Sequence, residues 1–292
     1  MKLKYTLNST KYTIVKDVLK AHFHISDRLL LKLKRHHKIF VNNNPAFVYT
    51  PVYLNDDICV DISFDEISEN ILPIKMSLDI VFEDEAMLIL NKPAGVPVHP
   101  SMNHFSDSLS NGVQYYFEKN HIHTKIRPVN RLDKNTSGLV IFAKNEYVQE
   151  SMIRQMANHT FEKYYLAILS GTLDDINQSG TINAPIARKA DSIIEREINP
   201  AGQVAITHYK LIKNDTDFCL VEFQLETGRT HQIRVHSKYL GHPILGDSLY
   251  GNASELIARQ ALHSYKISFI HPITNTKMEF KTPLPDDMCK II

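Results

Sequence analysis

RPVNRLDKNTSGLVIFAK, at residues 127–144, joins a polar loop directly to an apolar run. The run LVIF at residues 139–142 predicts a buried strand that would hold the preceding loop in one pose. Gly138, at the junction, would allow close approach of the backbone. Asp133 is the one acidic residue of the segment. Two interpretations fit this local pattern: Asp133 is a positioned nucleophile, or it makes an Asx-type turn with Thr136 and Ser137.

Two further motifs flank this segment in the chain. NKPAGVPVHP lies upstream at residues 91–100, and LETGRTHQIRVH lies downstream at residues 225–236. Together the three resemble the motifs of the RluA-type family of RNA pseudouridine synthases, whose signature has His-Arg-Leu-Asp before Thr-Ser-Gly-Leu. KYYLA at residues 163–167, GHP at 241–243 and PLPD at 283–286 also fit, so the resemblance covers most of residues 79–287. Asn130 stands where the family usually has His.

The resemblance implies a catalytic role for Asp133. Conversion of uridine to pseudouridine breaks the glycosidic bond, turns the uracil and rejoins it through carbon, and one carboxylate can serve this chemistry. Attack on the sugar, addition to the uracil ring and abstraction of a sugar proton all stay open. Arg229, from the motif GRTHQ, would pair with Asp133 and keep it ionised. The alternative for Arg229 is a structural arginine at a helix start beneath a Thr230 cap.

The same resemblance implies how a base would be held. Tyr165 matches the tyrosine of the family's Lys-x-Tyr pattern, so its ring would stack on a flipped uracil. Its alternative is an ordinary core aromatic. Tyr164 would face the other side of the strand and pack in the core. Ile233 would form the apolar wall opposite the stacked ring.

Flipping a base out of its stack leaves a gap that a protein side chain must fill. Arg131 and Asn130, just before Asp133, are the candidates for this role. Lys92, together with Lys134 and Lys144, would contact RNA phosphate, or would be simply solvated.

Charge is distributed unevenly along the chain. Residues 1–55 contain ten Lys and Arg against two acids, a formal charge of +8 that leaves −7 for the rest of a chain whose net charge is +1. Such a basic N-terminal region is typical of proteins that bind RNA. The alternative is a solvated helix face that binds no partner. Helical spacing over residues 14–40, a turn at residues 43–45 and a strand near residues 57–62 resemble the small RNA-binding domain first named from ribosomal small-subunit protein four.

Six acids between residues 56 and 69, with no Lys or Arg, indicate a linker. We therefore expect an RNA-binding α+β domain at residues 1–68 and a catalytic domain at residues 69–292. Helices are predicted near residues 107–119 and 146–157. Strands are predicted near residues 80–82, 87–90, 139–142, 165–169, 193–198, 205–212, 219–225 and 277–280. This mixture predicts an α+β fold with a mixed, mostly antiparallel central sheet.

The sequence gives no sign of a cofactor. Its 15 His residues lack metal-ligand spacing, and neither a dinucleotide fingerprint nor a phosphate-binding loop is present. Three separated cysteines indicate neither a disulfide framework nor a zinc site, and no apolar stretch reaches the length of a membrane span. We therefore expect a monomeric cytoplasmic protein without metal or cofactor.

The expected function is isomerisation of uridine to pseudouridine in RNA. The family and the basic N-terminal region favour large-subunit ribosomal RNA as the substrate, with transfer RNA as the alternative. Two other functions compete. The first is phosphoryl transfer from an aspartyl-phosphate loop, although the acids that would hold magnesium are missing around Asp133. The second is a non-catalytic RNA-binding or ribosome-assembly protein on the same scaffold.

Overall fold

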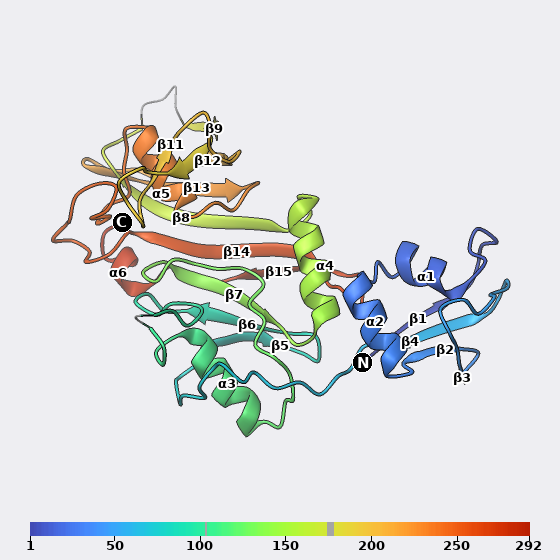
Figure 1. Ribbon diagram of the computed structural model, residues 1–292. Coiled ribbons are helices and arrows are strands. Elements are labelled where there is room, and N and C mark those ends of the chain that lie inside the picture. Colours follow the sequence, from blue (N-terminus) through green and yellow to red (C-terminus); the bar gives the residue numbers. More distant parts are fainter. Residues whose placement is uncertain (103, 174–177) are drawn as a thin grey trace.

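The computed structural model describes residues 1–102, 104–173 and 178–292. A small domain with a four-stranded sheet precedes a larger domain with a nine-stranded sheet. Figure 1 shows the small domain next to helix α4 (Glu146–Ala157), away from the C-terminus of the chain. No helix in the described ranges is long and apolar enough to span a bilayer.

The small domain contains two helices packed on an antiparallel sheet with strand order β1-β4-β2-β3. Helix α2 begins after Ser26, whose hydroxyl accepts the backbone N–H of Leu29 and so caps the helix. The sequence placed a turn at residues 43–45, but Asn44 already lies in a strand and the turn is Asn42-Asn43, with φ of 51° and 65°. Asparagine tolerates these left-handed angles, which a tight hairpin requires. The elements are β1 (Lys2–Thr6), α1 (Val15–Ala21), α2 (Asp27–Arg35), β2 (Ile39–Val41), β3 (Asn44–Pro45) and β4 (Asp57–Asp61).

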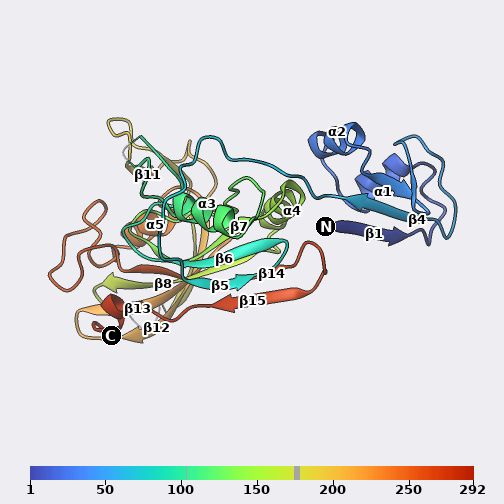
Figure 2. The ribbon, with the colours of Figure 1, turned by 90° about the horizontal axis from the view of Figure 1, so that it is seen from below.

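The large domain is a mixed, mostly antiparallel sheet, as the sequence predicted. Its strand order is β5-β6-β7-β14-β8-β13-β12-β9, with β15 also pairing β14. The strands are β5 (Ile80–Glu83), β6 (Met87–Lys92), β7 (Ser137–Ala143), β8 (Glu162–Ser170), β9 (Ser179–Asn183), β12 (Ile206–Asn214), β13 (Phe218–Leu225), β14 (Leu262–Ile270) and β15 (Lys277–Lys281), with a separate ribbon of β10 (Ile186–Arg188) and β11 (Arg196–Ile198). The helices are α3 (Leu109–Lys119), α4, α5 (Gln232–Tyr239) and α6 (Asp286–Cys289). Figure 2 shows α3 and α4 over the same face of the sheet.

Strand β7 forms the centre of the core, because all seven of its residues are buried. It pairs in parallel with β14 at Ser137 and Gly138. A Cβ atom on Gly138, whose φ is 114°, would lie 2.2 Å from the backbone oxygen of Ser264. Only glycine fits so close an approach, as the sequence pattern suggested. The loop that contains Asp133 therefore leads into a fixed strand.

Ion pairs connect the two domains, whose buried apolar residues also belong to one cluster. Glu66 lies in the segment between β4 and β5 and contacts Lys32 of helix α2 at 2.7 Å and Arg127 of the large domain at 2.5 Å. Arg28, also on α2, pairs with Glu146 of α4 at 3.0 Å. The expected boundary at residue 69 falls between β4 and β5, although the first acids of the expected linker, such as Asp57, belong to β4.

Candidate active site

A cavity of about 780 Å³ brings the three sequence motifs together. Residues 97–101 form one side, the loop at residues 128–133 forms another, and residues 228–234 form a third. Tyr165 of strand β8 also lines the cavity. Segments far apart in the sequence therefore place their polar groups around one space large enough for a small ligand.

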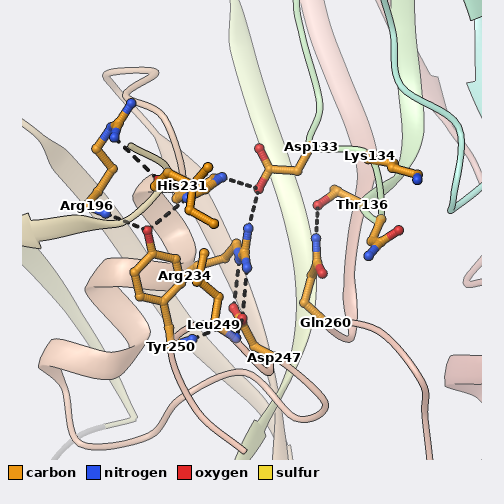
Figure 3. Close-up of polar contacts among 12 residues, drawn as sticks. Asp133, Lys134, Thr136, Arg196, His231, Arg234, Asp247, Leu249, Tyr250 and Gln260 are labelled. Atoms are coloured by element: carbon orange, nitrogen blue, oxygen red, sulfur yellow. Dashed lines mark hydrogen bonds and ion pairs between the residues drawn. The ribbon is translucent and has the colours of Figure 1, made fainter. Parts of the chain in front are cut away.

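Asp133 lies at this cavity and is held by an arginine. Its Oδ2 accepts a hydrogen bond from Nη1 of Arg234 at 3.1 Å, and 27% of the Asp133 side chain is exposed. The backbone carbonyl of Asp133, and not its carboxylate, accepts the N–H of Thr136 at 3.1 Å. Within the described residues, the carboxylate is thus not used in the Asx-type turn that the sequence left open. Figure 3 shows the carboxylate pointing toward Arg234.

Arg234 is itself fixed from behind by a second acid. Its Nε and Nη2 donate to the two carboxylate oxygens of Asp247 at 2.7 and 2.8 Å, a bidentate pair in which the Asp247 side chain is 1% exposed. Burial by itself lowers the pKa of Arg234, but the hydrogen bond and charge of Asp247, with those of Asp133, raise it above its ordinary value. The guanidinium is therefore a permanent cation whose remaining nitrogen, Nη1, donates to Asp133.

His231 is the third group around the carboxylate. It precedes helix α5 with a left-handed φ of 59°, and its Nδ1 lies 2.8 Å from the hydroxyl of Tyr250. Its Nε2 lies 3.8 Å from Oδ2 of Asp133. Burial lowers the pKa of His231, while the charge of Asp133 opposes this shift. The imidazole thus tends to be neutral beside the Asp133–Arg234 pair.

The predicted pairing of Arg229 with Asp133 is wrong. Arg229 is exposed, and its Nε donates to the backbone oxygen of Val204 at 2.9 Å. Among the described residues, the guanidinium beside Asp133 is that of Arg234. Arg229 lies in the loop before α5, and its N–H donates to the side chain of Gln232. Arg234 is on the helix itself and is directed to the cavity.

The predicted contact of Lys92 with RNA phosphate is also wrong. Its side chain is fully buried, and its ammonium donates to the backbone oxygens of Pro93, Val96 and Lys134 at 2.8, 2.7 and 2.9 Å. Burial lowers the pKa of Lys92 to about 7, an effect that the charge of Asp133 opposes. Lys92 therefore ties the turn after β6 to the residue that follows Asp133.

Asn130 does not have a free side chain for filling a gap in RNA. Its amide donates to the backbone oxygen of Leu139 at 3.0 Å and accepts the N–H of Ile141 at 2.9 Å. This buried residue instead connects the loop to strand β7. Arg131 is exposed at the edge of the cavity, and its guanidinium makes no hydrogen bond or ion pair in the described part of the chain. Its role in base flipping stays a prediction.

The two apolar contacts predicted for a base both line the cavity. Tyr165 is 7% exposed and Ile233 is 4% exposed. Burial raises the pKa of Tyr165 to about 12, with the Ser264 hydroxyl opposing and the charge of Asp133 adding to the shift. Tyr164 faces the other side of β8 but is only half-buried, under Lys266 at 3.7 Å from the ring centre, and not in the core as predicted.

Comparison with known proteins gives a family match across much of the large domain. The family model described as RNA pseudouridylate synthase matches residues 86–239, which include Asp133, Tyr165 and Arg234. The chain belongs to the RNA pseudouridylate synthase family. As an RNA pseudouridine synthase, it isomerises uridine in RNA to pseudouridine.

Relatives of this RNA pseudouridine synthase extend along most of the chain. It is 39% identical to the uncharacterised RNA pseudouridine synthase YhcT of Bacillus subtilis, over 95% of this chain and 90% of the relative. It is 33% identical to ribosomal large subunit pseudouridine synthase D of Neisseria meningitidis serogroup B, over 87% of this chain and 71% of the relative. Among solved structures, human RNA pseudouridylate synthase domain containing 1 is similar, with a TM-score of 0.59 and 26% identity over 71% of this chain and 83% of that one.

Sequence reasoning missed three residues around Asp133. Arg234 and His231 were inside a quoted motif, but without the start of α5 their proximity to Asp133 could not be seen. Asp247 lies four residues after the GHP motif that resembles the family, but the sequence did not show its partner.

Proposed function

We propose that Asp133 is the nucleophile of the isomerisation and that its target is a flipped-out uridine in structured RNA. The single observation that carries this proposal is the Arg234–Asp133 contact of 3.1 Å at the edge of the cavity. A carboxylate that is partly exposed and held by a fixed cation is positioned to act on a ligand in the cavity.

The isomerisation exchanges one bond between the sugar and the uracil for another. The bond between sugar C1′ and uracil N1 breaks, the uracil turns, and C5 bonds to C1′; the C5 proton is lost and N1 gains one. Asp133 supplies the electron pair that stabilises or captures the electron-deficient intermediate. Arg234 holds the carboxylate in place through this sequence, since its other edge is occupied by Asp247.

Base capture fits the cavity walls. A flipped uracil would stack on Tyr165, with Ile233 as a second apolar contact, because both side chains line the cavity that holds Asp133. Arg131, exposed at the edge, is the side chain that would take the place of the flipped base in the RNA stack.

Large-subunit ribosomal RNA is the proposed substrate. Support comes from the named relatives that modify the ribosomal large subunit and from the basic small domain at the start of the chain. The test is incubation of the protein with unmodified ribosomal RNA and, separately, with transfer RNA, followed by carbodiimide mapping of pseudouridine. Product in ribosomal RNA alone supports the proposal, and product confined to transfer RNA contradicts it.

Residues 1–68 are proposed to anchor the RNA. Helix α2 exposes Lys34 and Arg35, whereas Lys32 and Arg28 are engaged in the contacts between domains. We expect the double variant Lys34→Ala/Arg35→Ala to weaken RNA binding and to reduce the slope of log affinity against log salt by about 1–2, because each lost phosphate contact removes roughly 0.7–0.9.

The matched control changes two exposed lysines of the large domain, Lys210→Ala/Lys213→Ala on strand β12. Filter binding over a range of salt concentrations measures both variants. An unchanged salt slope for the α2 variant would mean that the small domain is not the RNA anchor. Substitution is preferred to deletion of residues 1–68, because deletion would also remove Glu66 from its contact with Arg127.

A further inference from the structure

Lys163 is a second buried lysine at the active site, and it is bonded differently from Lys92. It lies on β8 two residues before Tyr165, so the two side chains emerge on the same face of the strand. Lys163 is 9% exposed and lines the cavity that contains Asp133. Whereas Lys92 donates to three backbone oxygens, the ammonium of Lys163 has no hydrogen-bond acceptor or ion pair among the described residues.

An unpaired ammonium in such a place is costly for the folded protein. Removing a charge from water without a compensating partner is unfavourable, and burial accordingly lowers the pKa of Lys163. Gly228 lies directly over the group, since a Cβ at that position would be 3.5 Å from Nζ. The ammonium thus lines the cavity without a protein acceptor among the described residues, and water or a ligand in the cavity completes its hydrogen bonds.

We propose that the Lys163 ammonium donates a hydrogen bond to a carbonyl oxygen of the flipped uracil and stabilises the negative charge that forms on the base when the glycosidic bond breaks. This inference rests on the proposed function of Asp133 and extends it to the leaving base. Residues two apart on a strand are separated by about 7 Å, which lets a base stacked on Tyr165 present its carbonyl edge to Lys163.

The chemistry explains why a cation belongs there. When the C1′–N1 bond breaks, its electron pair stays on the uracil and spreads over the ring nitrogens and both carbonyl oxygens. Arg234 is committed to Asp133 and Asp247, so its charge is already balanced. An ammonium on a largely buried side chain stabilises the remaining charge more strongly than one in bulk water. Lys163 forms no covalent bond and returns unchanged once C5 has bonded to C1′.

A phosphate is a less suitable partner for this lysine. The exposed arginines of the cavity, Arg131 and Arg229, are the cations that a phosphate outside the cavity could reach. Lys163 is buried on the strand that holds Tyr165, beside the proposed position of the base. The contrast in burial favours a contact with the base and not with the backbone.

The test is single-turnover kinetics at saturating RNA, with a short RNA containing the mapped target uridine. Lys163→Met is expected to slow pseudouridine formation by about 10²–10³-fold, the usual effect of losing one preorganised donor, with RNA affinity within about twofold. Lys163→Gln, which keeps a donor without the charge, is expected to lie between Lys163→Met and the unmodified protein. Lys266→Met, which removes a lysine from the other face of the sheet, is the matched control with an unchanged rate.

A second measurement uses the unmodified protein, so it does not depend on how the variants fold. The target uridine is replaced by 2-thiouridine or 4-thiouridine, because sulfur accepts hydrogen bonds poorly. With one of the two thio-substituted RNAs, the single-turnover rate of the unmodified enzyme is expected to fall. The rate of the Lys163→Met variant is expected to be the same with that RNA as with the uridine RNA.

Two results would overturn the inference. The first is a single-turnover rate for Lys163→Met within about threefold of normal, including the case in which only affinity and salt slope fall, as for a phosphate ligand. The second is equal sensitivity of both proteins to thio substitution. Asp133→Asn, measured alongside, separates the two claims: an active Asp133→Asn contradicts the proposed function, and an active Lys163→Met contradicts only this inference.

Discussion

Asp133→Asn is expected to reduce pseudouridine formation by at least about 10⁴-fold, because an amide cannot serve as the nucleophile. Its Oδ1 can still accept the hydrogen bond from Arg234, and the side chain is partly exposed, so the free energy of unfolding should change by less than about 1 kcal/mol. Carbodiimide mapping of the product and thermal unfolding measure the two effects. RNA binding should stay within a few-fold of normal.

The outcome that contradicts this expectation is specific. Near-normal product from Asp133→Asn, with the protein folded and RNA bound, would remove Asp133 from the chemistry. Thr136→Val is a suitable companion, since Thr136 lies in the same loop and its hydroxyl contacts only Gln260 among the described residues, at 3.3 Å. It should retain most activity.

The second large effect separates two arginines of one motif. Arg234→Gln is expected to lower the rate by at least about 100-fold, because it removes the cation that holds Asp133. It should also destabilise the fold by about 3–5 kcal/mol, since Asp247 would stay buried without its partner. Arg229→Gln, at an exposed position, should change stability by less than about 0.5 kcal/mol and the rate by less than about tenfold.

Loss of folding alone must be told apart from loss of chemistry. Asp247→Asn serves this purpose, because its Oδ1 can still accept the backbone N–H groups of Leu249 and Tyr250 while its hold on Arg234 weakens. A folded Asp247→Asn with reduced rate and normal RNA affinity supports the arrangement. If Arg229→Gln were inactive and Arg234→Gln active, the assignment of Arg234 would be reversed.

Local patterns predicted those elements whose apolar residues form an unbroken run or recur with a helical period. Strand β7 and helices α3 and α4 appear close to their expected ranges, because their hydrophobic residues follow the right period. Strand β14, at the centre of the sheet, was not predicted. Its buried positions include His263, Ser264 and Ser268, which break the alternation of apolar and polar residues.

The buried histidine of β14 is tolerated because other parts of the chain supply partners for its ring. His263 lies 2.9 Å from the hydroxyl of Ser137 and 3.0 Å from that of Thr282. Burial lowers the pKa of His263 to about 4, so the ring is neutral at physiological pH. Ser137 and Thr282 are far from His263 in sequence, and a local pattern cannot show such partners.

The same limit explains which site residues were predicted. Asp133 and Tyr165 come from short motifs whose positions on loop and strand are set locally. The sequence indicated Arg229 instead of Arg234 as the partner of Asp133, because it does not show where helix α5 begins. That point is fixed by the left-handed His231 and its contact with Tyr250. Lys92 was misassigned because its three carbonyl partners are brought together only by the folded turn.

The ion pairs of Glu66 with Lys32 and Arg127 give the two-domain arrangement a further meaning. In the proposed complex with RNA, helix α2 and the cavity would bind the RNA at two points a fixed distance apart. Binding at both points would therefore position the RNA as well as retain it. Only a uridine at that fixed distance from the RNA stem bound by α2 would reach Asp133. The target would then be selected by distance, without recognition of the surrounding bases.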